Sequence, residues 1–135
     1  MAPRKRTTDS HSALAEPTAT PGRRVFFGDG LEHFDAGRYW DAHEAWEQAW
    51  RDLGDGPEDD GELVLRGLIQ LAAALHGAAL GRELPAARNL AKAAPKLACS
   101  DGRLWGLDVT RLNQRIGAAG GDPGRLLGAA LLRLP

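Results

Sequence analysis

One imidazole and one carboxylate stand four residues apart in residues 39–53, the stretch of the chain richest in chemically active side chains. On a helix, His43 and Glu47 lie within reach of each other. Burying an unpaired charge is costly, so we expect the two groups to satisfy each other. His43 falls inside a predicted apolar face, Glu47 lies at its edge, and Glu44 points towards the polar side. That apolar face is formed by Tyr39, Ala42, Trp46, Ala49, Trp50 and Leu53.

A second predicted helix, from about residue 60 to residue 80, is the element expected to face this stretch. It is apolar around nearly its whole circumference, which is typical of a central, buried helix. Its few polar side chains are therefore the candidates for contact with His43 and Glu47. They are Arg66, Gln70 and His76.

These two stretches together resemble a catalogued family. The pattern Phe34-x-x-Gly37-x-Tyr39-Trp40-x-Ala42-His43-Glu44-x-x-Glu47-x-x-Trp50, followed by the run Arg66–His76, is similar to domain-of-unknown-function family 309. Its members are small all-helical proteins with the signature H-x-x-x-E-x-x-W, matched here by His43, Glu47 and Trp50. The similarity extends over about residues 26–116, and Asp35 stands where the family often has Asn. The resemblance implies a compact helical bundle and a signature that binds a metal, but it implies no reaction.

The metal interpretation takes His43 and Glu47 as two ligands and His76 as the third, with Gln70 or Glu44 as a further donor. Histidines mixed with carboxylates suit zinc, manganese or iron. The sequence of this motif is His-Glu-x-x-Glu, so it matches neither the His-Glu-x-x-His of zinc proteases nor the Glu-x-x-His of di-iron bundles.

A buried polar network is the other interpretation, and we favour it. His43 would stack among Tyr39, Trp46 and Trp50, with its ring nitrogens satisfied by Glu47 and by a side chain of the Arg66, Gln70 and His76 helix. Alternatively, Arg66 pairs with Glu47, which would occupy the carboxylate and argue against a metal. Trp40 lies at the edge of the apolar face, where it could pack, anchor a partner or line a cleft.

Composition narrows the class of protein. The chain has 135 residues, a net charge of −1 and one cysteine, Cys99, so an intrachain disulfide is impossible. A reducing, cytoplasmic location is expected, with Cys99 a small core residue. No apolar run reaches membrane-spanning length, and nucleic acid is not the expected partner of so neutral a chain.

Hydrophobic periodicity predicts an all-α fold, a compact bundle of five to six helices. Residues 1–24 are expected to form a disordered tail with the basic cluster Arg4-Lys5-Arg6, and residues 25–135 one helical domain. Asp29 is expected to cap the first, short helix, Pro95 to end or kink a later one, and Asp122-Pro123 to start a last one. Gly37-Arg38 recurs as Gly81-Arg82, 44 residues later, which suggests two stacked helical hairpins.

No catalytic constellation emerges, so the sequence does not favour an enzyme. The favoured interpretation is an interaction or structural module of unknown molecular function, with an unidentified protein partner and His43, Glu47 and Gln70 as internal structure. The alternative is a divalent-metal-binding protein, either a hydrolase or a redox protein. The third is a nucleic-acid accessory protein, for which Arg103, Arg111 and Arg115 are the only hint of a basic face.

Overall fold

The computed structural model describes residues 3, 5–8, 14–54, 61–131 and 133. It confirms the all-α class, with one very small hairpin of two-residue strands. The elements in chain order are α1 (Pro21–Asp35), α2 (Tyr39–Arg51), α3 (Glu62–Ala79), α4 (Glu83–Ala98), β1 (Arg103–Leu104), β2 (Leu107–Asp108), α5 (Val109–Ala119) and the short 3-10 helix η1 (Pro123–Leu126).

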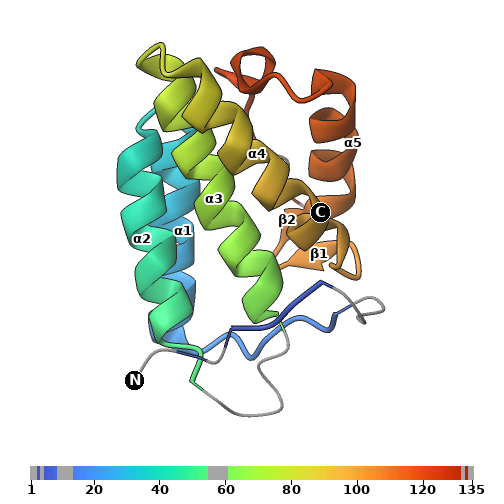
Figure 1. Ribbon diagram of the computed structural model, residues 1–135. Helices are drawn as coiled ribbons and strands as arrows, with labels where there is room; N and C mark the ends of the chain where they lie inside the picture. The colour runs from blue at the N-terminus through green and yellow to red at the C-terminus, as the bar shows by residue number, and fades with distance from the viewer. Residues whose placement is uncertain (1–2, 4, 9–13, 55–60, 132, 134–135) are drawn as a thin grey trace.

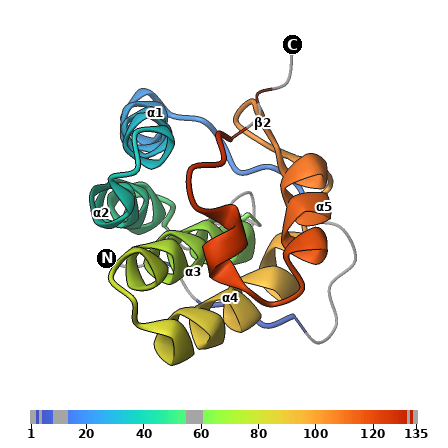
Figure 2. The same ribbon diagram turned by 90° about the horizontal axis from the view of Figure 1, so that it is seen from above.

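Helices α1 and α2 form one antiparallel hairpin, and α3 and α4 form a second (Figure 1). Seen from above, α1 to α4 follow one another in an arc, with α5 on the far side and η1 between them (Figure 2). Helix α3 contacts both α2 and α4, and most of its residues are buried. The helix that is apolar all round is therefore the central one, as the sequence predicts.

The turns of the two hairpins have nearly the same geometry. Gly37 and Gly81 both have positive φ, 79° and 75°, a region that glycine enters without steric cost. The next amide, of Arg38 or Arg82, donates a hydrogen bond of 2.8 Å to a carbonyl five residues earlier. The 44-residue sequence repeat therefore corresponds to a repeated structural turn, and both turns lie at the same end of the bundle (Figure 1).

Trp46 is the largest fully buried side chain, and it fixes the approach of α1 to α2. Its indole Nε1 donates to the carbonyl of Phe27 at 3.1 Å, so the buried N–H is satisfied. A methyl group at Gly30 would overlap the Trp46 ring. The first hairpin thus packs because a glycine of α1 leaves room for this indole.

Two predicted boundaries were wrong, and one of two alternatives for a third was excluded. Helix α1 begins at Pro21, capped by the Thr20 hydroxyl, and not at Asp29. Pro95 lies inside α4 and does not end it, because α4 continues to Ala98, whereas a kink at Pro95 stays a prediction. The expected last helix is the single 3-10 turn η1, although Asp122 does cap it.

Residues 14–20 lie against one end of the bundle, before α1 begins (Figure 1). Leu14 is 8% exposed, and its amide donates to the carbonyl of Cys99 at 2.6 Å. The indole of Trp105 donates to the carbonyl of Pro17 at 2.9 Å, and the guanidinium of buried Arg23 donates to that of Thr18 at 2.7 Å. The division into a disordered tail of residues 1–24 and one helical domain stays a prediction, but helical structure starts earlier than it assumes.

Candidate functional site

His43 lies against Trp40, on the outer side of α2. The two rings are stacked, with centroids 4.3 Å apart and planes inclined by only 9°. The ring of His76, from α3, lies 5.2 Å from the Trp40 ring, tilted by 42°. Trp40 is 45% exposed, so part of its indole remains accessible. Two helices thus assemble a histidine–tryptophan–histidine cluster at the surface.

Burial keeps His43 neutral. Its side chain is 15% exposed, and its Nδ1 is a buried atom without a hydrogen-bond partner among the described residues. Desolvation lowers the pKa of His43 below its ordinary value, an effect that nearby Glu47 and Glu44 oppose and His76 reinforces. The Nε2 atom lies 3.7 Å from Glu47 Oε2, a distance that suits an ion pair but not a hydrogen bond.

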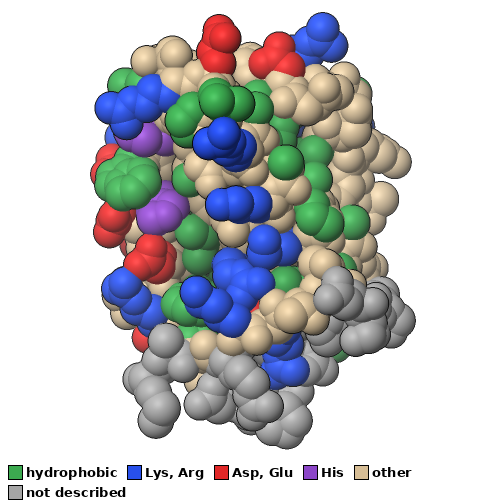
Figure 3. Space-filling view, viewed as in Figure 1, with side chains coloured by type: hydrophobic (Ala, Val, Ile, Leu, Met, Phe, Trp, Pro, Cys, Tyr) green, Lys and Arg blue, Asp and Glu red, His purple; other side chains and the backbone are tan. Residues whose placement is uncertain are grey.

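Two acidic side chains of α2, Glu44 and Glu47, lie near this cluster. Glu44 is exposed one helical turn after Trp40, at the i,i+4 spacing that places two side chains side by side. Glu47 pairs with Arg51 as well as approaching His43. In Figure 3 two histidine side chains lie on either side of a hydrophobic one, with acidic side chains close by. We call Trp40, His43, Glu44, Glu47 and His76 the α2–α3 surface.

The predicted stacking of His43 among Tyr39, Trp46 and Trp50 was wrong. Trp46 is buried against Phe27, and the Tyr39 hydroxyl accepts a hydrogen bond from the amide of Gly128 at 2.9 Å. These aromatic side chains point towards the core, so Trp40 is the aromatic neighbour of His43. Trp40 and His43 are three residues apart, the other spacing that brings helical side chains together.

A second polar cluster was missed by the sequence reasoning, and Glu62 is at its centre. Glu62 is 1% exposed and is the first residue of α3. Its Oε1 accepts from Trp50 Nε1 at 2.9 Å and from Arg66 Nη1 at 3.1 Å. Arg66 therefore pairs with Glu62, and the alternative pairing of Arg66 with Glu47 was wrong. The i,i+4 spacing of Glu62 and Arg66 could have indicated this pair. The spacing of Asp59 and Glu62 also suits a capping box at the start of α3, but Asp59 lies outside the described residues.

Gln70 does not complete the predicted network. Its Oε1 is buried without a hydrogen-bond partner among the described residues, as is His43 Nδ1. The polar groups of this region therefore fall into two clusters, one around Trp40 and one around Glu62, and not into the single network that we expected.

The arrangement does not fit a metal with three protein ligands. No group of three or more His, Cys, Asp or Glu side chains in the described part of the chain could hold an ion. The rings of His43 and His76 each lie against the Trp40 ring. A metal held by His43, Glu47 and His76 stays a prediction that this geometry does not support.

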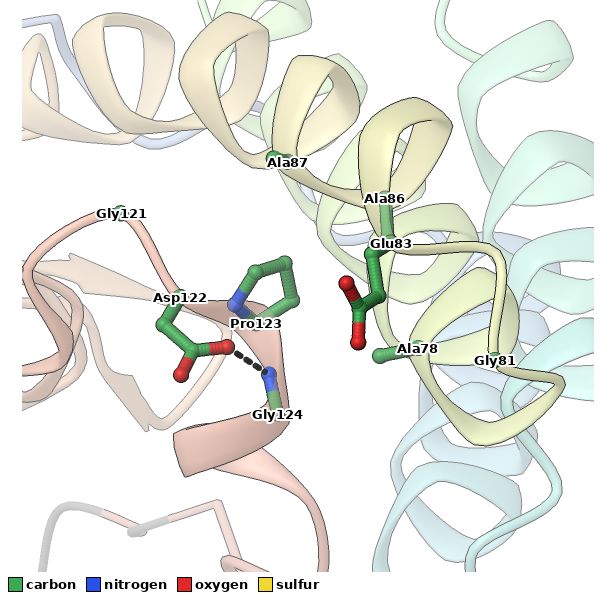
Figure 4. A pocket seen from close by; sticks show the side chains of 9 residues that line it. All are labelled: Ala78, Gly81, Glu83, Ala86, Ala87, Gly121, Asp122, Pro123 and Gly124. Carbon is green, nitrogen blue, oxygen red and sulfur yellow. Dashed lines mark hydrogen bonds between the residues drawn. The ribbon is translucent and has the colours of Figure 1, made fainter.

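A cavity of about 410 Å³ lies between the turn joining α3 to α4 and the loop before η1 (Figure 4). Its walls are mostly small residues, and the Glu83 carboxylate points into it. The other carboxylate, that of Asp122, caps η1 by accepting from the amide of Gly124 at 3.0 Å. None of the predicted site residues lines this cavity.

Positive side chains follow one another along α4, and Arg51 pairs with Glu47 of the α2–α3 surface. Arg88, Lys92 and Lys96 recur every four residues along α4, and Lys and Arg side chains run down the middle of Figure 3. The three arginines that suggested a basic face differ in their surroundings. Arg103 lies 4.0 Å from Glu16, Arg115 donates to the carbonyl of Ala130, and Arg111 is exposed. A nucleic-acid accessory role stays a prediction.

Cys99 shows no sign of an activated thiol. Burial raises its pKa, and its Sγ lies 3.3 Å from the carbonyl of Pro95. A raised pKa keeps the thiol protonated and weakly nucleophilic.

The fold is thus a bundle built on two repeated helical hairpins, with a histidine–tryptophan cluster at its surface. The family model described as "Domain of unknown function (DUF309)" matches residues 27–89, which run from α1 into α4. This confirms the predicted family resemblance over those residues. No curated protein matches the chain. Among the described helices, none is both long enough and apolar enough to cross a membrane.

Proposed function

We propose that this chain is a helical interaction module whose α2–α3 surface binds a cationic side chain, an arginine above all, of a protein partner. The observation that carries this is the exposed Trp40, held flat against His43 and beside His76. A large aromatic ring left 45% exposed on a helix is available for contact. Tryptophan and arginine are the side chains that most often anchor protein interfaces.

The chemistry around the indole suits a guanidinium. An aromatic face attracts a cation placed within about 6 Å, and tryptophan is the best of the aromatic side chains. The exposed carboxylate of Glu44 stands one turn away, and that of Glu47 borders His43. A planar guanidinium can stack on the indole and donate to a carboxylate at the same time, which an ammonium cannot do as well.

His43 contributes by remaining uncharged. Because burial lowers its pKa, the ring next to Trp40 does not repel a bound cation at neutral pH. Its stacked position also limits the rotation of the Trp40 side chain. A pre-ordered indole loses less conformational entropy on binding, which favours affinity.

A cytoplasmic location belongs to the same proposal. Its support is that Cys99 is a free thiol and that a chain with a single cysteine has no intrachain disulfide.

The test is an NMR titration of the protein with arginine amide and, separately, with citrulline amide, its neutral isostere. The amide signals of Trp40, His43 and Glu44 are expected to shift with arginine amide and to stay in place with citrulline amide. Affinity for such a small probe is expected to be about millimolar.

The matched control is a pair of carboxylate variants. Glu44→Gln is expected to weaken the shifts several-fold, because it removes the exposed charge one turn from Trp40. Glu83→Gln, a change at the cavity of Figure 4, is expected to leave them unchanged. Equal shifts with arginine amide and citrulline amide, or no shift with either, would refute the proposal.

A further inference from the structure

Helix α4 carries two apolar stripes. The first is buried and packs against α3, where Ala86 lies on Gly77 and Leu97 lies on Gly67. The second is exposed or half-buried and starts at Leu84, which is 61% exposed. We call this second stripe the outer seam, and its members are Leu84, Ala87, Ala91, Ala94 and Ala98. The fold thus leaves an apolar face of α4 accessible.

The spacing along the outer seam is that of a contact between two helices. Its members follow one another at intervals of three, four, three and four residues. This alternation keeps apolar side chains on one line of a helix, as in a coiled coil, where a facing helix packs its side chains between them. Alanine adds little bulk, so another helix can approach α4 closely. The outer seam therefore favours a helix, and not an extended segment, as its partner.

An open groove lies beside the outer seam, between α4 and α5. The two helices meet where Asn113 Nδ2 donates to the carbonyl of Leu97 at 3.1 Å. Elsewhere between them is a cavity of about 340 Å³, which shares Ala87 and Gly121 with the cavity of Figure 4. We call the two cavities together the α4–α5 groove. The walls of its smaller cavity are formed by Ala87, Leu90, Ala91, Ala94, Ile116, Gly117 and Gly121.

The groove has room for side chains larger than those that line it. Most of its lining residues are alanine or glycine. A methyl group at Gly117 of α5 would lie in open space, so α5 does not fill the groove. Bulky apolar side chains of an incoming helix would gain contacts there that the chain itself does not supply.

Basic side chains border this groove on the side of α4. Arg88 and Lys92 come directly after Ala87 and Ala91, so they lie next to the outer seam, and both are exposed. Neither forms an ion pair within the part of the chain that the structure describes. In Figure 3 hydrophobic side chains lie beside the row of Lys and Arg side chains. The α4 rim of the groove therefore attracts negative charge.

The acidic groups of the groove gather at one end, formed by the turn joining α3 to α4 and the loop before η1. The Glu83 carboxylate points into the cavity there, and Asp122 lies 3.8 Å from Arg125. A helix in the groove is therefore expected to place its own acidic residues along the α4 rim and not at this end.

We propose that the α4–α5 groove binds an amphipathic helix of a partner protein, with bulky apolar side chains on its contact face and acidic side chains beside them. The apolar side chains would pack on the outer seam and fill the groove, which is the usual way a helix binds in a groove. The acidic side chains would pair with Arg88 and Lys92 and so select the partner. None of the residues of the α2–α3 surface belongs to this site.

A second copy of this chain is a poorer occupant. In a two-fold pair of α4 helices, the basic rim formed by Arg88 and Lys92 would be present on both partners, and like charges disfavour such a contact. The outer seam of the second copy would also supply mostly alanine side chains, which are too small to fill the groove.

The probe is a fluorescein-labelled helical peptide of about 20 residues, with leucine at the heptad positions a and d and glutamate at the positions that flank them. Its matched control carries lysine in place of each glutamate. The readout is fluorescence polarisation with the full-length protein at low salt. The glutamate peptide should bind about tenfold or more tightly than the lysine peptide, and added salt should reduce the difference. The double variant Arg88→Glu, Lys92→Glu should reverse the preference.

A blocking variant separates binding in the groove from plain charge attraction. Gly117→Leu places a side chain in the groove at a position where leucine also suits the helix better than glycine, so the fold should persist. It should weaken binding of the glutamate peptide about tenfold or more, because the groove is then filled. Ala118→Leu is the matched control, since the next residue of α5 is exposed and lies outside the groove. It should bind as wild type does, and so should Trp40→Ala, which changes only the α2–α3 surface.

Three results would overturn the proposal. Equal binding of the peptide to Gly117→Leu and Ala118→Leu would show that the groove is not the site. Equal binding of the glutamate and lysine peptides would remove the preference for an acidic helix. A dimer of the protein alone in sedimentation equilibrium, lost in Gly117→Leu, would assign the groove to a second copy of this chain.

Discussion

Replacing Glu62 by glutamine should destabilise the fold far more than the same replacement of any other glutamate near the candidate sites. The carboxylate is 1% exposed and accepts from Trp50, Arg66 and the amide of residue 6. Glutamine has the same shape but keeps one acceptor oxygen, and its amino group would face an N–H donor. It also leaves the Arg66 charge, 18% exposed, without its counterion.

The size of the effect follows from these contacts. Loss of one hydrogen bond to a charged group costs about 1.5–2 kcal/mol, and the unpaired Arg66 adds about 1 kcal/mol because solvent partly screens it. We therefore expect a loss of about 3 kcal/mol in the free energy of unfolding. Glu47→Gln is the matched control, because Glu47 is 29% exposed and its pair with Arg51 is a surface pair worth about 0–1 kcal/mol.

The assay is urea unfolding of both variants, followed by far-ultraviolet circular dichroism. A lower midpoint with an unchanged m-value identifies a change of stability and not of the unfolded state. The reasoning would be refuted if Glu62→Gln cost no more than Glu47→Gln, because Glu62 would then not be the satisfied, buried charge described above.

Three further outcomes are expected. In urea unfolding, Gly30→Ala should lose about 2–3 kcal/mol of stability, because its methyl group overlaps the Trp46 ring. Gly28→Ala, on the same helix but with open space around it, should gain about 0.5–1 kcal/mol. Similar effects at both sites would contradict the packing of Gly30 against Trp46. Because the folded pKa of His43 is lowered, the unfolded chain takes up more protons below pH 6.5, so stability falls as the pH drops through 6.5, with a slope of at most about 1.4 kcal/mol per pH unit from this group. The difference between wild type and His43→Asn in urea unfolding from pH 7.5 to 5.5 should show that slope, with Glu44, Glu47 and His76 unchanged in both; parallel curves would be inconsistent with a desolvated imidazole. Protein purified without tag or chelator should hold well under one equivalent of zinc, manganese or iron by mass spectrometry; about one equivalent, lost in a folded His43→Asn variant, would restore the metal interpretation.

The sequence predicts the helices well because hydrophobic periodicity is a local property. Helix α2 was expected within residues 39–53 and spans Tyr39–Arg51, and the apolar α3 is indeed central. The start of α1 was missed because Thr20 and Pro21, a good cap and first-turn residue, stand in a stretch whose composition resembles a linker. The last helix was overpredicted because leucine spacing alone does not show that Gly128 breaks it, with φ of 78°.

The sites were less predictable because they depend on which helices meet and at which rotation. Spacing on one helix indicated the His43–Glu47 pair, and it is present at 3.7 Å. The stacking partner of His43 was misjudged, because a broad apolar helix face does not reveal which of its aromatic side chains reaches the surface. In the structure that side chain is Trp40. The role of Glu62 requires contacts with Trp50, 12 residues away, and with residue 6, 56 residues away. No local pattern encodes such long-range contacts.

The most direct test of the proposed binding surface is the titration of the four tryptophan indole N–H signals with arginine amide in one NMR sample. The indoles of Trp46, Trp50 and Trp105 donate to groups within the protein, so their signals serve as internal references. The account predicts that the Trp40 indole signal alone moves in a saturable way, and that citrulline amide leaves it in place. A stationary Trp40 signal, or equal movement of all four, would contradict the claim that this indole is the cation-binding anchor.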